Sequence, residues 1–231
     1  MRLLMNVRNS IDFFFRTNLP VPRLSVVEKK NDTLRKDDLL RTEIKEFMSL
    51  FNELKHLPSL PSHPTVVDIG ARNFFMAPLI ERFFSDKGVA PEIHGVEIDS
   101  HRRYTDLRTR ADYGFYYAGL IPRSHFHPKS FLDFSLSADF AFLLNPFVTE
   151  EPLLCWGLPL TEFLPLRMYL HLFKYLAPNG LVLTSHPSEE EYEAGRELAE
   201  KAGFTIIETR SWHPRPGSSQ TQPRLGYLLK K

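Results

Sequence analysis

Acidic side chains follow two apolar runs of this sequence, at positions suited to binding a polar ligand. Asp68 lies in the β-branched run TVVDI, and Gly70 follows it closely. A glycine after a buried strand lets a ligand approach the backbone, and the first amides of the next helix attract an anion. Burial of the Asp68 carboxylate is costly unless it holds loop amides or a ligand's ammonium group. The pattern fits a binding turn at residues 68–73, and it also fits an acid that caps its own turn.

The run HGVEID supplies a second set of acids. Glu97 and Asp99 are two residues apart, so on a strand their side chains point to the same side. An acid at the tip of the second strand of a nucleotide-binding fold accepts hydrogen bonds from ribose hydroxyls. We assign that role to Glu97. Asp99 or Ser100 is then expected to cap the next helix.

The elements that must position these acids alternate along the chain. Apolar residues recur at helical spacing over residues 33–57 and precede a proline-rich connector. The order after it predicts a parallel sheet covered by helices on both faces, with a terminal antiparallel pair. We therefore expect a helical extension at residues 1–57 and an α/β domain at residues 58–231. The expected strands are 65–69, 93–98, 115–118, 140–144, 181–185, 205–208 and 225–229, and the expected helices of the domain are 73–85, 100–111, 166–176 and 188–203.

Composition narrows the function classes. The chain has 231 residues and a formal net charge of +1, which gives no bulk attraction to nucleic acid or acidic membranes. Its one cysteine, Cys155, excludes an intrachain disulfide and a zinc site of several thiolates. No run approaches the roughly 20 apolar residues of a membrane span, and the start is no secretory signal. A cytoplasmic protein is expected.

The two acidic runs carry a family resemblance. Residues 66–70 (VVDIG) followed by residues 95–99 (GVEID) resemble the first two nucleoside-binding motifs of class I S-adenosylmethionine-dependent methyltransferases. Residues 176–183 (LAPNGLVL) resemble that family's helix stop, turn and fifth strand, and the terminal pair resembles its closing hairpin. The resemblance spans roughly residues 62–231.

The resemblance implies a Rossmann-like, doubly wound, seven-stranded and mostly parallel sheet. It also implies bound S-adenosylmethionine as cofactor and transfer of its methyl group to a nucleophile. Ala118 and Gly119, taken to follow the third strand, fall where the family contacts the adenine. The expected cofactor-binding residues are Asp68, Gly70, Ala71, Arg72, Asn73, Glu97, Ala118 and Gly119.

The first motif departs from the family in its glycine content. Arg72 and Phe74 stand where the family has its later glycines. Arg72 can pair with the carboxylate of the ligand, or it can fill the pocket and abolish binding. The second outcome would make the chain a non-catalytic binding or scaffold protein with a methyltransferase-like fold. A nicotinamide dehydrogenase is disfavoured because the Gly-x-Gly-x-x-Gly pattern is missing.

A candidate for the reacting end of the site follows the fourth expected strand. Asn145-Pro146-Phe147 partly resembles the Asn/Asp-Pro-Pro-aromatic motif with which some family members hold a planar amine, and it equally fits an Asn-Pro turn. Asn145 is our candidate for aligning the methyl acceptor. The apolar stretch 147–164 can form a pocket for an apolar acceptor or pack against the N-terminal helix.

Other residues give weaker signals. His125 and His127 alternate as metal ligands do, but no acidic or third histidine partner has an obvious spacing, so a loop pair is expected and no metal site is predicted. The basic cluster at residues 101–103 also fits a solvated face better than an RNA site. The methyl acceptor is undefined by the sequence, a small molecule being one option.

Overall fold

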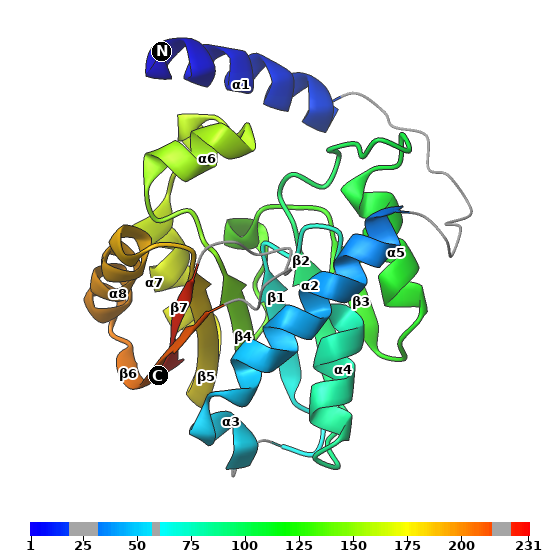
Figure 1. The fold of residues 1–231 in the computed structure, drawn as a ribbon, viewed down its shortest axis with the longest axis vertical. Helices are drawn as coiled ribbons and strands as arrows, with labels where there is room; N and C mark the ends of the chain where they lie inside the picture. Colours follow the sequence, from blue (N-terminus) through cyan, green and yellow to red (C-terminus); the bar gives the residue numbers. More distant parts are fainter. Residues whose placement is uncertain (19–31, 57–60, 214–222) are drawn as a thin grey trace.

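The computed structural model describes residues 1–18, 32–56, 61–213 and 223–231. These residues form one seven-stranded sheet in the order β3-β2-β1-β4-β5-β7-β6. Six strands run parallel, and β7 runs antiparallel to both of its neighbours. The expected doubly wound α/β fold with a terminal antiparallel hairpin is therefore confirmed (Figure 1). The strands are β1 Thr65–Ile69, β2 Glu92–Val96, β3 Ser124–His127, β4 Ala138–Leu144, β5 Leu176–His186, β6 Thr205–Trp212 and β7 Arg224–Lys230.

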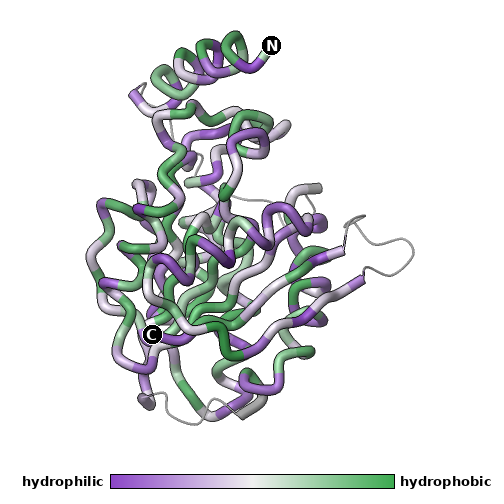
Figure 2. The backbone as a smooth tube through the Cα atoms, turned by 90° about the vertical axis from the view of Figure 1, so that its left-hand side faces the viewer, coloured by the Kyte–Doolittle hydropathy of each residue, from purple (hydrophilic) through white to green (hydrophobic). Residues whose placement is uncertain are grey.

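Helices cover both faces of this sheet, as its apolar strands require. One face packs against α2, α4 and α5, with Phe47, Ile80 and Tyr113 in a single buried cluster. The opposite face packs against α7 and α8, through Tyr169 and Ala199. Figure 2 shows the resulting apolar interior along the strands. The helices are α1 Arg2–Asn18, α2 Asp32–Ser49, α3 Asn52–His56, α4 Ala77–Ser85, α5 Arg110–Gly119, α6 Glu150–Trp156, α7 Pro165–Tyr175 and α8 Glu189–Ala202, with short 3-10 turns η1 Phe131–Asp133 and η2 Leu160–Glu162.

The region between β2 and β3 differs from expectation. The third strand expected at residues 115–118 belongs to helix α5, and β3 begins at Ser124. The helix expected at residues 100–111 is a series of turns, and α5 begins only after Thr109. Thr109 and Asp112 form a reciprocal capping box, which is a stronger start signal than Ser100. The aromatic run of α5 has strand propensity but packs as the buried face of a helix.

The remaining elements follow the sequence pattern closely. Ser188 caps α8 by accepting a hydrogen bond from the Glu191 amide at 3.2 Å, as expected. The helix expected at residues 73–85 begins later, at Ala77, because the preceding residues form turns. The strand expected at residues 181–185 is longer, since β5 already starts at Leu176.

The two N-terminal helices attach to the sheet in different ways. Helix α2 buries Ile44, Phe47 and Met48 in the same cluster as the strands, so it is a full member of one helical layer. Helix α1 lies beside α6 at one end of the molecule (Figures 1 and 2) and is held mainly by polar groups. Its Asn9 donates to the carbonyl oxygens of Leu154 and Leu158 at 2.9 and 3.0 Å. None of the helices in the described part of the chain has the length and apolar content to cross a bilayer.

Candidate functional site

The turn after β1 adopts the backbone conformation of a glycine-rich loop, although it contains one glycine. Gly70, Arg72 and Phe74 all have positive φ, at 71°, 53° and 61°. Left-handed backbone is costly for Arg and Phe, so the surrounding structure must hold it in place. The amides of Gly70 and Ala71 both donate to the Val96 carbonyl oxygen, at 2.9 and 3.0 Å. The turn therefore holds left-handed backbone at Arg72 and Phe74, where the family resemblance led us to expect glycines.

Phe74 occupies the space that a second glycine leaves open. A Cβ atom on Gly95 of β2 would lie 2.3 Å from the Phe74 ring. The ring is fully buried and lies 5.9 Å from the ring of Phe126 on β3. Phe74 and Gly95 thus fit each other across the loop and the second strand. Phe74 is consequently a core residue and leaves the ligand side of the turn free.

Asp68 is a buried acid with an unsatisfied oxygen. Its side chain is 3% exposed, and its Oδ2 atom has no hydrogen-bond partner among the described residues. Burial, and secondly the negative charge of Glu97, raise the pKa of Asp68 to about 7. A cationic or hydroxyl-bearing ligand would supply the missing partner.

Glu97 is a buried acid with several partners. Its Oε2 accepts a hydrogen bond from the Arg72 amide at 2.7 Å, and its Oε1 accepts one from the Asp99 amide at 2.7 Å. Arg110 Nη1 lies 3.4 Å from the same Oε1. Burial raises the Glu97 pKa, and the Arg110 charge opposes that shift. A carboxylate has about four lone-pair sites, and three of them face these partners, so Glu97 can accept about one further hydrogen bond from a ligand hydroxyl.

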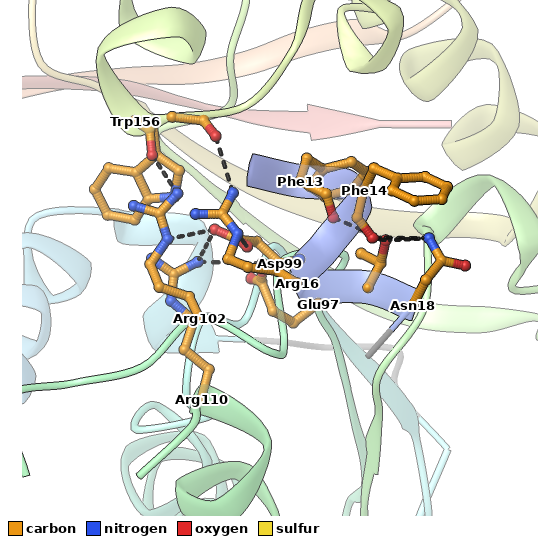
Figure 3. Close-up of polar contacts among 11 residues, drawn as sticks. Phe13, Phe14, Arg16, Asn18, Glu97, Asp99, Arg102, Arg110 and Trp156 are labelled. Atoms are coloured by element: carbon orange, nitrogen blue, oxygen red, sulfur yellow. Dashed lines mark hydrogen bonds and ion pairs between the residues drawn. The ribbon is translucent and has the colours of Figure 1, made fainter. Parts of the chain in front are cut away.

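Arginines surround Asp99 and Trp156 beside the β2 tip (Figure 3). Asp99 lies 2.5 Å from Arg102 Nε, 3.2 Å from Arg110 Nη1 and 3.5 Å from Arg16 Nε of α1. The guanidinium carbons of Arg102 and Arg110 lie 5.6 and 4.9 Å from the centre of the Trp156 ring. Asp99 therefore fixes a basic cluster and caps no helix, which corrects the expected capping role of Asp99 or Ser100.

A cavity of about 430 Å³ opens at the carboxyl ends of β1 and β4. This is the point where the strand order reverses, and the volume is within the range of small-molecule sites. Six of the expected site residues line it, and sequence reasoning missed other lining residues on α2, β7 and the turn after β3. The expected residues are Asp68, Gly70, Ala71, Arg72, Glu97 and Asn145, and missed ones include Leu40, Ile44, Ser130, Phe131, Met168 and Arg224.

Three expected residues lie elsewhere. Ala118 and Gly119 are the last residues of α5 and do not line the cavity, so their assignment to the adenine is wrong. Ser130 and Phe131 follow the true third strand and line the cavity in their place. The Asn73 side chain is buried and donates to Asp37 Oδ2 of α2 at 2.8 Å, so it joins the turn to that helix.

Asn145 lies at the cavity wall with its side-chain oxygen already bound. The oxygen accepts hydrogen bonds from Ser185 Oγ at 3.1 Å and from Arg224 Nη1 at 3.3 Å. The Asn145 backbone has a φ of 53°, a left-handed conformation that Asn tolerates better than most residues. The amide nitrogen is therefore the group of this side chain that can still donate a hydrogen bond to a ligand. Arg224, on β7, could not be linked to this site by sequence spacing.

The apolar stretch 147–164 forms part of the cavity wall, as the pocket alternative predicted. Phe147, Leu153 and Trp156 line the cavity. The helix that lies on this segment is α1, which precedes the helical pattern expected at residues 33–57. Arg16 of α1 donates to the Gly157 carbonyl oxygen at 2.9 Å. The N-terminal helix thus closes over the segment that forms one cavity wall.

The donor set fits S-adenosylmethionine in most respects. Asp68 offers an unpartnered buried oxygen, and the Arg72 Nε atom is buried without a partner among the described residues. An ammonium and a carboxylate on one ligand would match these two charges. The expectation that free amides after β1 attract an anion is wrong for Gly70, Ala71 and Arg72, because all three amides donate to protein oxygens. The cation for a ligand carboxylate must therefore come from a side chain, and Arg72 and Arg224 are the arginines that line the cavity.

Comparisons with known proteins identify the fold. No family model matches the sequence, and no curated protein matches it. Among solved structures, a methyltransferase from Pyrococcus furiosus aligns with a TM-score of 0.56 and 16% identity, covering 100% of this chain and 96% of that one. A magnesium protoporphyrin IX methyltransferase from Synechocystis, with bound S-adenosylmethionine, aligns with a TM-score of 0.56 and 13% identity, covering 100% of this chain and 96% of that one. An N-methyltransferase from Bradyrhizobium japonicum, in complex with S-adenosylhomocysteine, aligns with a TM-score of 0.54 and 10% identity, covering 97% of this chain and 98% of that one. The chain has the fold of class I methyltransferases.

Proposed function

We propose that this protein is an S-adenosylmethionine-dependent methyltransferase that acts on a small acceptor. The observation that carries the proposal is the cavity at the reversal point of the sheet, with Asp68 and Glu97 on its walls. The solved structures of the same fold include methyltransferases with the cofactor or its product bound, which supports the same cofactor here.

Each charged group of the cavity binds a different part of the cofactor. Glu97 accepts a hydrogen bond from a ribose hydroxyl, and Asp68 accepts one from the ammonium group through its unpartnered Oδ2. Arg72 pairs with the carboxylate, because the nearby amides are already bonded. Ser130 and Phe131 follow β3 and contact the adenine in place of Ala118 and Gly119.

The protein's own part in the reaction is mainly positional. When bound, the cofactor supplies an activated methyl group on a sulfonium, so no strong general base is obligatory. Asn145 aligns the acceptor through its amide nitrogen, because Ser185 and Arg224 hold the side-chain oxygen. Phe147, Leu153 and Met168 give that end of the cavity an apolar lining that excludes water and admits an apolar or aromatic acceptor.

The cytoplasmic location expected from composition remains a prediction.

Calorimetric titration of the purified protein with S-adenosylmethionine tests the proposal. We expect saturable binding of one equivalent, and mass spectrometry of the native protein should detect any nucleoside that copurifies. Glu97→Ala should weaken binding, whereas Glu197→Ala, an exposed acid on α8, should not. Absence of binding at millimolar ligand would favour the alternative, a non-catalytic binding or scaffold protein with this fold.

A further inference from the structure

A second cluster of ligating side chains lies on the edge of the sheet, away from the cavity. Glu92 and His94 are two apart on β2, and His125 and His127 are two apart on β3. The strands pair in parallel with His94 beside His125, so all four side chains project from one face. The expectation that His125 and His127 form a loop pair without partners is wrong, because the neighbouring strand supplies Glu92 and His94.

Three atoms of this cluster have the spacing of metal ligands. Glu92 Oε1 lies 3.4 Å from His94 Nε2 and 3.4 Å from His125 Nε2. All three atoms lie within 4.8 Å of one another. Tetrahedral Zn²⁺ with bonds of about 2.0–2.1 Å places its ligand atoms about 3.4 Å apart. Two edges of that tetrahedron are thus already present. The rings of His94 and His125 are stacked with their centroids 4.9 Å apart, so the half-exposed His125 ring must turn before both nitrogen lone pairs can meet on one ion.

His94 is the side chain that most needs a ligand. It is 7% exposed, and within the described part of the chain the only polar contact of its Nε2 atom is the one with Glu92 Oε1 at 3.4 Å. Its Nδ1 atom lies 3.0 Å from His127 Nε2. If Nδ1 carries the proton and donates it to His127, the lone pair of Nε2 points into the cluster. Metal-binding histidines are commonly oriented by such a second hydrogen bond.

The donor atoms of the cluster suit a divalent cation. Two imidazole nitrogens and one carboxylate oxygen form a nitrogen–oxygen donor set that Zn²⁺ accepts readily.

We propose that Glu92, His94 and His125 bind one Zn²⁺ ion, with water completing the coordination and His127 as the positioning residue for His94. None of these four residues lines the cavity, so this site is independent of the proposed methyl transfer. The ion would join edge strand β3 to β2 through side chains of both strands. Its effect is then on the stability of that edge, and the main chain of β3 leads directly to the cavity residues Ser130 and Phe131.

Titration of the untagged, metal-stripped full chain with zinc chloride tests the proposal. Cys155 is an exposed thiol, so every protein should carry Cys155→Ser. We expect one equivalent of zinc to bind the parent and to raise its melting temperature. His125→Ala removes a half-exposed ligand, so it should fold and bind zinc at least 100-fold more weakly. His127→Ala should weaken binding about 10- to 100-fold, the usual effect of losing a second-layer partner.

The matched control is His213→Ala, an exposed histidine just after β6 and outside the cluster. It should bind zinc as the parent does. Failure of the parent to bind zinc, or equal affinity in His125→Ala and the parent, would overturn the proposal. A change in zinc affinity of His213→Ala as large as that of His125→Ala would overturn it too. Zinc binding without S-adenosylmethionine binding would contradict the proposed function and leave the zinc site standing.

Discussion

The tips of β1 and β2 each present a buried carboxylate to the same cavity, but the two carboxylates differ in how many of their oxygens have hydrogen-bond partners. Asp68 is 3% exposed and has an oxygen without a partner, whereas Glu97 is 5% exposed and accepts from two amides and lies near Arg110. Burial raises the pKa of both acids, but only Glu97 has a nearby cation among the causes that oppose the shift. The comparison indicates that the acid at the β2 tip is held by protein groups without a ligand, whereas the acid at the β1 tip needs a ligand to supply its missing hydrogen-bond partner.

The largest effect should come from the turn after β1, which packs against β2 through Phe74. Phe74→Ala removes a fully buried ring and should lower the free energy of unfolding by about 3–5 kcal/mol, measured by urea denaturation. Phe14→Ala removes a ring that is 60% exposed on α1 and should change stability by less than about 0.5 kcal/mol.

A double variant makes this prediction specific. Gly95→Ala alone should be destabilising, because its Cβ would lie 2.3 Å from the Phe74 ring. In the Phe74→Ala background the same change should cost much less, since the ring is gone. Additive effects of the two substitutions would show that Phe74 and Gly95 do not depend on each other.

The second prediction concerns the β1 tip and the effect of Asp68 on how stability depends on pH. The Asp68 carboxyl has its ordinary pKa of 3.8 in the unfolded chain and a pKa of about 7 in the folded protein. The folded state therefore keeps a proton that the unfolded chain releases, so the Asp68 contribution to stability is complete below pH 3.8. It is lost as the pH rises towards 7. Between pH 5 and pH 8 the parent should lose about 2–3 kcal/mol through this group.

Urea unfolding of the parent and of Asp68→Asn at these two pH values measures the difference. The variant cannot ionise at this position, so its stability should depend less on pH. Asp86→Asn, at the exposed end of α4, should keep the pH dependence of the parent. Identical pH profiles for the parent and Asp68→Asn would mean that Asp68 has an ordinary pKa in the folded protein.

The sheet and most residues of the β1 and β2 tips could be predicted from the sequence, because each is marked by a pattern of neighbouring residues. Buried β-branched runs, the capping serine of α8 and the acids after β1 and β2 can all be recognised within a few residues. The third strand was misplaced because Tyr113 and Tyr117 belong to an aromatic run whose strand propensity is overridden by packing in a helix. The capping box at Thr109 and Asp112 was the signal that could have corrected it.

Residues that reach the site from distant parts of the chain could not be predicted. Arg224 meets Asn145 only because β7 is inserted between β5 and β6. Leu40 and Ile44 line the cavity because α2 packs on the sheet. His94 lies beside His125 through the register of two strands separated by α5. Such contacts depend on topology and register, which spacing along one sequence does not specify.

The third prediction concerns ligand binding at the β2 tip. Glu97→Ala should weaken S-adenosylmethionine binding by about 1–3 kcal/mol, because a ligand hydroxyl loses its acceptor. Calorimetric titration measures the change, and Glu97→Gln retains one acceptor oxygen and should lose less. Parental affinity in Glu97→Ala would exclude Glu97 as a ligand-binding acid and leave it only a structural role at the β2 tip.

The smallest effect should come from α1, which reaches the β2 tip through Arg16. Asp99 lies near three arginines, and Arg16 is the most distant of them at 3.5 Å. Arg16→Ala should therefore lower stability by less than about 1 kcal/mol in urea denaturation, since Arg102 and Arg110 still neutralise the acid. Asp99→Ala should cost more, because it leaves a buried Arg110 with fewer partners. If Arg16→Ala were as destabilising as Asp99→Ala, the β2 tip would depend on α1 and would not be built independently of it.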